Sequence, residues 1–231
     1  MFASEVLRLV SGALQDLEPG MAQRWPWERD EHGGICLLDF LNAARRAIAL
    51  QRPDCCAITE PIRLEPGMRQ QLPQRARHGA SRNATGFCGL VRNMGHDGEH
   101  PGRVIGSVQP DVLLAWSETE RPAHVVNNFA YDRAQNGQIY YVSPPVAEGR
   151  DVWVEATYYC APEEIVSAMQ DLNMADDYIE PIQHHMLASI LSGDNESGNP
   201  QLASLHLQQF QALLGIKQQL DTAWPKTKAG M

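Results

Sequence analysis

Apolar residues follow two different rhythms along this chain, and the change from one to the other constrains the fold most strongly. Near both ends they recur every three or four positions, as at Val6 and Val10, which is typical of amphipathic helices. In the middle they alternate with polar residues, as at Val152 and Val154, which is typical of strands. The order helices, strands, helices favours an α+β fold over a parallel α/β design.

This order also predicts the domain organisation. We expect helices from the two ends, residues 1–54 and 162–220, to pack together as a bundle. Residues 55–161 then form an inserted antiparallel β module, a small sheet or sandwich with long loops. Residues 221–231 are expected to be an extended C-terminal tail.

Several helices are expected from the spacing of the apolar residues. They cover residues 2–17, 37–51, a segment that begins at Pro162, residues 177–191 and residues 201–214. The helix over residues 37–51 ends before Arg52-Pro53, because the residue before a proline avoids helical geometry. In that helix we expect Arg45 and Arg46 to point outward.

Strands are expected in the central module. Residues 57–64 and 69–72 are predicted to pair as a hairpin around the turn Glu65-Pro66-Gly67-Met68. Residues 74–102 are polar and glycine-rich, and we expect a long excursion interrupted by a short strand over 87–92. Further strands are expected at residues 125–131, 138–142 and 151–159, with Pro144-Pro145 breaking the pattern after the second.

The charge balance excludes some functions. With 28 acidic and 19 basic residues the formal net charge is −9, which argues against a free-standing duplex-binding protein, since that needs a basic face. An acidic wall would repel a passing duplex rather than hold it. We expect neither a membrane span nor a secretory signal, and we expect the five cysteines to be reduced thiols.

Two groups of residues could bind a metal. Glu180 and His184 lie four positions apart on an expected helix, next to His185, but no third ligand is evident nearby. His96 and His100 flank a glycine-containing acidic loop that lacks the oxygen spacing of a calcium loop. We therefore expect no metal site and no cofactor.

Thiol chemistry is the other candidate. Cys55 and Cys56 are adjacent and could form only a strained disulfide, and no CxxC spacing is present. Cys88 could act as a nucleophile only beside a histidine that nothing in the sequence brings to it. We expect no catalytic residues, so the chain is predicted not to be an enzyme.

Four stretches of sequence, in this order, carry a resemblance. They are LLDFLNAARRAIALQRPD followed by AITEPIRLEPGMRQQLP (37–73), GLVRNMGHDG with PGRVI (89–105), FAYDRAQNGQIYYVSPPV with VWVEATYYCAP (129–162), and FQALLGIKQQLD (210–221). Together they resemble the head-to-tail adaptor, or connector, proteins of short-tailed bacteriophages, a group that includes the tail tubular protein A type of portal-docking adaptor.

The resemblance implies a structural virion protein at the neck of the particle, assembled in the host cytoplasm. It implies a homo-oligomeric ring of about twelve copies that docks on the portal and connects it to the tail tube or nozzle. Genomic DNA would pass through the lumen without sequence-specific binding. The portal-facing candidates are then Leu220, Trp224, Lys226 and Lys228, and the tail-facing candidates are Glu65, Pro66, Gly67, Met68, Asn93 and Met94.

Two alternatives remain open at this stage. One is a thiol- or metal-dependent hydrolase that uses Cys88 or His184. The other is a monomeric virion assembly factor that binds another particle protein.

Overall fold

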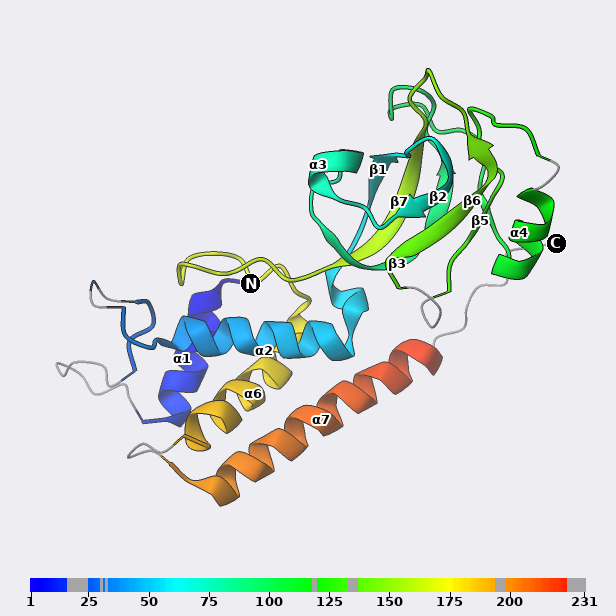
Figure 1. Ribbon diagram of the computed structural model, residues 1–231. Helices are drawn as coiled ribbons and strands as arrows, with labels where there is room; N and C mark the ends of the chain where they lie inside the picture. The colour runs from blue at the N-terminus through cyan, green and yellow to red at the C-terminus, as the bar shows by residue number, and fades with distance from the viewer. Residues whose placement is uncertain are drawn as a thin grey trace. The chain divides into compact units, whose positions relative to one another are not determined.

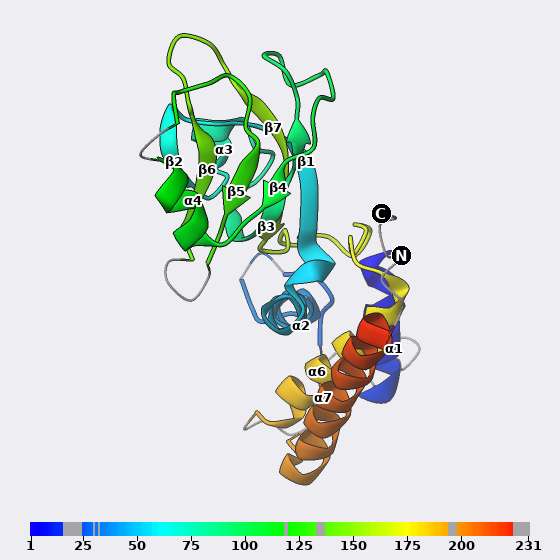
Figure 2. The same ribbon diagram turned by 90° about the vertical axis from the view of Figure 1, so that its right-hand side faces the viewer.

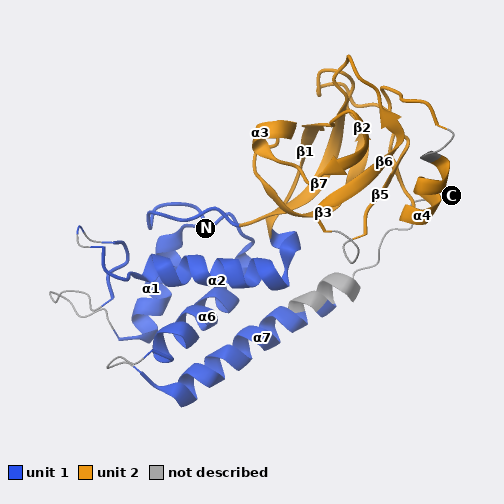
Figure 3. Ribbon diagram, viewed as in Figure 1, with its two compact units in different colours: residues 1–55, 162–231 blue, residues 56–161 orange. Residues whose placement is uncertain are grey.

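The computed structural model describes residues 1–15, 25–29, 31, 33–117, 120–132, 137–193 and 198–223, with side chains in the last range described for 198–216 and 219. The chain divides into two compact units (Figure 3). Unit 1 comprises residues 1–55 and 162–231, and unit 2 comprises residues 56–161. Helices dominate unit 1 and strands dominate unit 2, so the predicted α+β class is confirmed.

Unit 1 is built around the helix α6 (Ile179–Leu191), which packs against the other three helices (Figure 1). These are α1 (Ala3–Ala13), α2 (Leu37–Gln51) and α7 (Pro200–Ala223). Short 3-10 turns, η1 (Pro53–Cys56) and η2 (Asp176–Tyr178), follow α2 and precede α6. The core side chains are apolar and include Val6, Leu7, Leu41, Ile48, Ile182, Met186 and Ile190.

The helix α2 has the predicted bounds because both of its ends are encoded locally. At its start the backbone N–H of Cys36 donates to the Asp39 carboxylate at 3.0 Å, which satisfies a donor that the helix itself cannot. At its end Pro53 follows the C-cap Arg52.

Two helix predictions were wrong. No helix begins at Pro162, since the backbone from 162 to 175 is irregular, and α7 runs nine residues past the expected end at 214, to Ala223. The prediction that Arg45 points outward was also wrong, because its side chain is only 2% exposed. Arg45 instead donates to the backbone carbonyls of Glu163 and Leu172, the latter at 2.8 Å, and so ties the irregular segment to α2.

Unit 2 contains two sheets. The first is antiparallel, with strand order β1 (Ala57–Arg63), β7 (Trp153–Cys160), β3 (Ala84–Asn93). The second has the order β2 (Gly67–Gln71), β6 (Ile139–Val146), β5 (Asn128–Ala130), β4 (Gly106–Ser107), with a parallel pair between β4 and β5. Two short helices, α3 (Arg75–His78) and α4 (Pro110–Ser117), complete the unit. Its core is formed by apolar side chains from both sheets, among them Ile62, Phe87, Tyr140, Val142, Val154 and Tyr158.

The predicted hairpin between residues 57–64 and 69–72 was wrong. Both strands exist, but β1 pairs with β7, where Ile62 lies opposite Val154, and β2 pairs with β6 in the other sheet. The intervening turn therefore carries the chain from one sheet to the other. We call residues 64–68 the crossover.

The expected strand bounds were also too short at two places. The strand expected over 87–92 is β3, of ten residues, with three register irregularities against β7. The strand β6 continues through Pro144 and Pro145 to Val146. Among the described residues neither β2 nor β5 has a residue in register with these prolines, so their missing N–H groups cost no ladder bond.

Candidate interaction surfaces

The crossover is held in one conformation by a buried glutamine. The side-chain amide of Gln70 donates to the carbonyl of Glu65 at 2.7 Å and to that of Gly67 at 3.1 Å, while its oxygen accepts from the Glu65 N–H at 2.9 Å. Gly67 has φ +102°, a conformation that strains any residue with a Cβ. The loop so fixed exposes Pro66 and leaves Met68 half-buried.

A polar hollow of about 860 Å³ adjoins the crossover in unit 2. Its charged lining residues are Arg63, Glu65, Arg77, Arg150 and Asp151. Arg63 and Asp151 approach to 3.5 Å, and Arg77 and Glu65 to 4.0 Å. The charged groups of these exposed pairs can readily bind water instead of one another. The hollow therefore suits a polar partner more than an apolar ligand.

Asn93 anchors the loop that follows β3. Its amide donates to the carbonyls of Arg103 at 3.0 Å and Val126 at 2.8 Å, and its oxygen accepts from the Val126 N–H at 2.9 Å. The side chains of Asn93 and Met94 are 6% and 7% exposed. They position the loop, whose exposed part begins at Gly95.

The loop over residues 95–102 rests on Trp153. A Cβ on Gly98, at φ +83°, would lie 3.1 Å from the indole ring, and a Cβ on Gly79 would lie 3.2 Å from it. His100 Nδ1 lies 2.8 Å from the Asp97 carboxylate. The backbone N–H of Glu99 donates to the Asp97 carboxylate, and this hydrogen bond together with His100 holds the pKa of Asp97 below its usual value.

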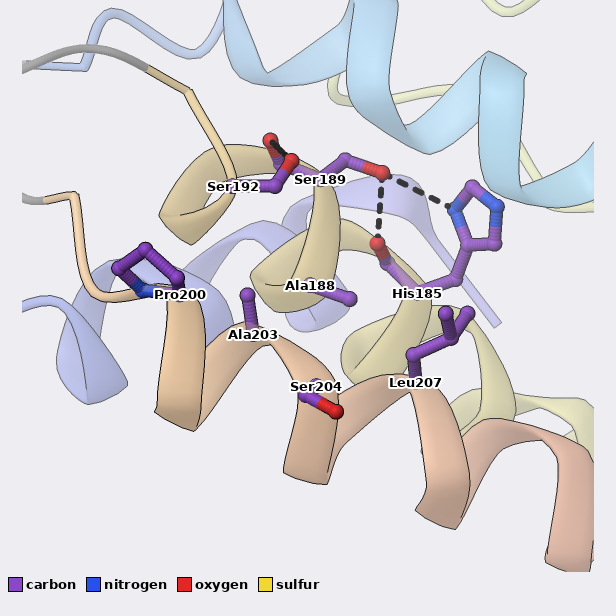
Figure 4. Close-up of a pocket in the computed structure, with 8 residues that line it drawn as sticks. All are labelled: His185, Ala188, Ser189, Ser192, Pro200, Ala203, Ser204 and Leu207. Carbon is purple, nitrogen blue, oxygen red and sulfur yellow. Dashed lines mark hydrogen bonds between the residues drawn. The ribbon is translucent and has the colours of Figure 1, made fainter.

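In unit 1 a hollow of about 380 Å³ lies between the last turns of α6 and the first turns of α7 (Figure 4). Its lining residues are mostly small or apolar: His185, Ala188, Ser189, Ser192, Pro200, Ala203, Ser204 and Leu207. The Ser189 hydroxyl donates to the His185 carbonyl at 2.9 Å, and burial lowers the pKa of the His185 imidazole. The Ser189 hydroxyl also lies 3.5 Å from Nδ1 of His185, one turn earlier on the same helix, and Ser192 donates to the Ser189 carbonyl. None of the described residues that line the hollow has a carboxylate to orient the histidine.

The residues proposed for metal or thiol chemistry have structural roles or lie apart. His184 pairs with His206 of α7, with their Nδ1 atoms 2.8 Å apart, so one imidazole donates to the other. Burial, and then the charge of His184, lower the pKa of His206. Cys88 is exposed on β3, none of the five cysteines is in a disulfide, and among the described residues no three His, Cys, Asp or Glu side chains are grouped to hold a metal.

The portal-facing candidates fall at the edge of what the structure describes. Leu220 lies on α7, but its side chain is outside the described residues. Trp224, Lys226 and Lys228 lie outside them altogether. None of the helices in the described part of the chain is long and apolar enough to cross a membrane.

A surface that the sequence analysis missed lies along α7. Exposed large apolar side chains recur on this helix at Leu202, Leu205, Leu207 and Ile216. The sequence signal was available, because no Asp, Glu, Lys or Arg occurs between positions 200 and 216.

Comparison with known families identifies the family of the chain. The family model described as SU10 adaptor protein matches residues 1–229, nearly the whole chain. The chain belongs to the SU10 adaptor protein family. The predicted resemblance to phage head-to-tail adaptors is thereby confirmed. No curated protein matches the chain.

Membership defines the class of function. An SU10 adaptor protein is a structural component of a bacteriophage, located at the neck of the virion, and its family is of a non-enzymatic kind. Among the described residues, the crossover, the loop over residues 95–102 and the exposed side of α7 are the candidate surfaces for contact with other proteins.

Proposed function

We propose that this SU10 adaptor protein is the subunit of a closed ring, of about twelve copies, that docks beneath the portal and connects it to the tail tube or nozzle. The observation that carries this proposal is the family match over residues 1–229. The ring is assembled in the host cytoplasm, which suits a chain whose five cysteines form no disulfide.

The C-terminal residues are proposed to bind the portal. The helix α7 runs to Ala223 and so includes the first three residues of the expected tail over 221–231, which also holds Trp224, Lys226 and Lys228. An aromatic and two lysines, together with Leu220, provide an apolar anchor and positive charge for an acidic surface on the partner.

Unit 2 is proposed to face the tail. The crossover residues Glu65 to Met68 are fixed by Gln70, so they present a preformed surface that loses little conformational freedom on binding. Asn93 and Met94 contribute by positioning the exposed loop over residues 95–102.

DNA is proposed to pass through the ring without being gripped. The formal net charge of −9 makes each copy repel phosphates on average. We therefore expect the side chains that line the lumen to be acidic or neutral, and a continuous basic stripe there would contradict this part of the proposal.

Deletion of the tail tests the portal contact. The full chain and a variant ending at Asp221 are mixed with purified portal rings, and the bound copies per ring are counted by native mass spectrometry. We expect saturation by the full chain and at least tenfold weaker binding by the truncated one, with unchanged circular dichroism.

Two outcomes would contradict the proposal. Full occupancy of the portal by the truncated chain would show that the C-terminal residues are not needed to bind it. Binding of a single copy per portal by the full chain would instead favour the monomeric assembly factor.

A further inference from the structure

The helix α7 is the outer layer of unit 1. Its principal contact is with α6, and at 1.5 Å per residue its 24 residues span about 36 Å against about 20 Å for the 13 residues of α6. Of the side chains described on it, only Ala203, Phe210 and Leu214 are buried. Because α7 packs within unit 1 along one narrow side, most of the described side chains on this helix remain exposed or half-buried.

A second regular pattern runs along the uncovered side. Leu202, Leu205, Gln209, Ala212 and Ile216 are all exposed and follow one another at intervals of three, four, three and four residues. We call these five residues the outer stripe. At about 100° per residue the outer stripe lies about 140° around the helix from the buried side chains, so it is not an extension of the α6 contact. This spacing is the one with which a helix packs against a second helix.

The exposed apolar area on the outer stripe is substantial. Leu202, Leu205 and Ile216 keep 39%, 50% and 54% of their surface exposed. From Pro200 to Ile216 the helix has no charged residue, although 20% of the chain is charged and about three would be expected. An exposed helix side normally has charged residues, so this one has the composition of a covered surface.

The net charge of the chain and the lack of charge on the outer stripe together favour a second copy of the chain as the molecule that covers the stripe. Each copy has a formal net charge of −9, so two copies repel one another unless they meet through surfaces without carboxylates. The outer stripe is such a surface, and contact through it would bury no unpaired charge on α7.

Ring symmetry then requires the outer stripe to meet a different side of the next copy. A ring of more than two subunits needs two different faces on each subunit, joined head to tail. Figures 1 and 2 show the irregular segment over residues 162–175 on the side of α2 away from α7. That segment exposes Val166 and Met169 by 69% and 75%.

We propose that the outer stripe of α7 binds the next copy of the chain in the ring, on the side of unit 1 that exposes Val166 and Met169. This inference rests on the proposed ring function and adds the surface through which neighbouring copies join. The residues proposed for the portal begin at Leu220, beyond the outer stripe, so the two contacts are separable.

Photo-cross-linking tests which molecule covers the stripe. A benzoylphenylalanine replaces Leu205, or Gln211 as the control, because Gln211 is exposed on the same helix but outside the stripe. Equal amounts of ¹⁴N- and ¹⁵N-labelled chains are assembled on portal rings, irradiated and digested. We expect position 205 to give mixed-isotope cross-links between copies, to peptides containing Val166 or Met169, and position 211 to give few.

Cross-links from position 205 only to the portal, only within one copy, or to another part of the neighbouring copy would overturn the proposal. The isotope label separates contacts between copies from contacts within one. If the unsubstituted chain fails to assemble on portals at all, it is the proposed function that fails.

Charge substitutions give an independent readout. Leu205→Glu places a carboxylate in the stripe, and we expect at least a tenfold loss of ring occupancy, because an unpaired charge would be buried at the contact. Gln211→Glu adds the same charge outside the stripe and should change occupancy less than about twofold. Gln209→Glu, nearly equal in size, repeats the test if Leu205→Glu loses helix content. Normal occupancy by a folded stripe variant would refute the proposal.

Discussion

Replacement of Arg45 should loosen the segment that it holds. In Arg45→Met the apolar stem is largely retained, but the bonds to the carbonyls of Glu163 and Leu172 are lost. A hydrogen bond from a charged donor contributes about 1.5–3 kcal/mol. Glu163 is exposed and its carbonyl can bind water after the change, so we expect a loss of about 2–4 kcal/mol in the free energy of unfolding of unit 1.

Urea unfolding combined with amide hydrogen exchange measures this effect. We expect faster exchange over residues 163–172, with unit 2 unchanged. Arg46→Met is the matched control, since Arg46 is the next residue on α2 and is exposed, and it should cost less than about 0.5 kcal/mol. Equal small effects for both variants would refute the view that Arg45 anchors this segment.

Three further predictions concern stability. Because the pKa of His206 is lowered, the folded chain binds fewer protons than the unfolded chain below about pH 6.5, so stability should fall from pH 7 toward pH 5. His206→Gln should flatten that slope in urea titrations, and an unchanged slope would contradict the assignment. Gly98→Ala should cost at least about 1 kcal/mol more than Gly149→Ala, because both positions have positive φ but only the first adds a Cβ against Trp153; equal thermal shifts would contradict this. Asn93→Ala should cost about 2–4 kcal/mol through three lost hydrogen bonds, and denaturant midpoints that imply less than 1 kcal/mol would show that the loop does not depend on it.

Local signals in the sequence were sufficient for several elements. The ends of α2 are set by its capping residues and by Pro53, and the alternation along β7 matches its burial pattern. These features depend on residues within a few positions of one another. The α+β class follows from them.

Pairing between distant segments could not be predicted in the same way. The turn at residues 65–68 looks like that of a hairpin, but β1 lies beside β7, with Ile62 opposite Val154 far along the chain. Arg45 resembles a surface residue until the carbonyls of Glu163 and Leu172 are placed beside it. Both errors arose because the deciding contacts are remote in sequence.

The candidate interaction surfaces differ in how clearly the sequence marks them. A turn at residues 65–68 was predicted from its proline and glycine, although as part of a hairpin, and the structure adds the buried Gln70 that fixes it. The outer stripe of α7 was missed because only the side of this helix that packs within the chain was sought in the sequence. The lack of charge over residues 200–216 would have marked it as a surface for a partner.

A reconstruction of the virion neck by cryo-electron microscopy, without imposed symmetry, tests the central claim most directly. We expect density for the chain as one closed ring between portal and tail, with every α7 against a neighbouring copy. Necks in which the chain is missing, or is bound as separate copies that do not touch, would contradict the account.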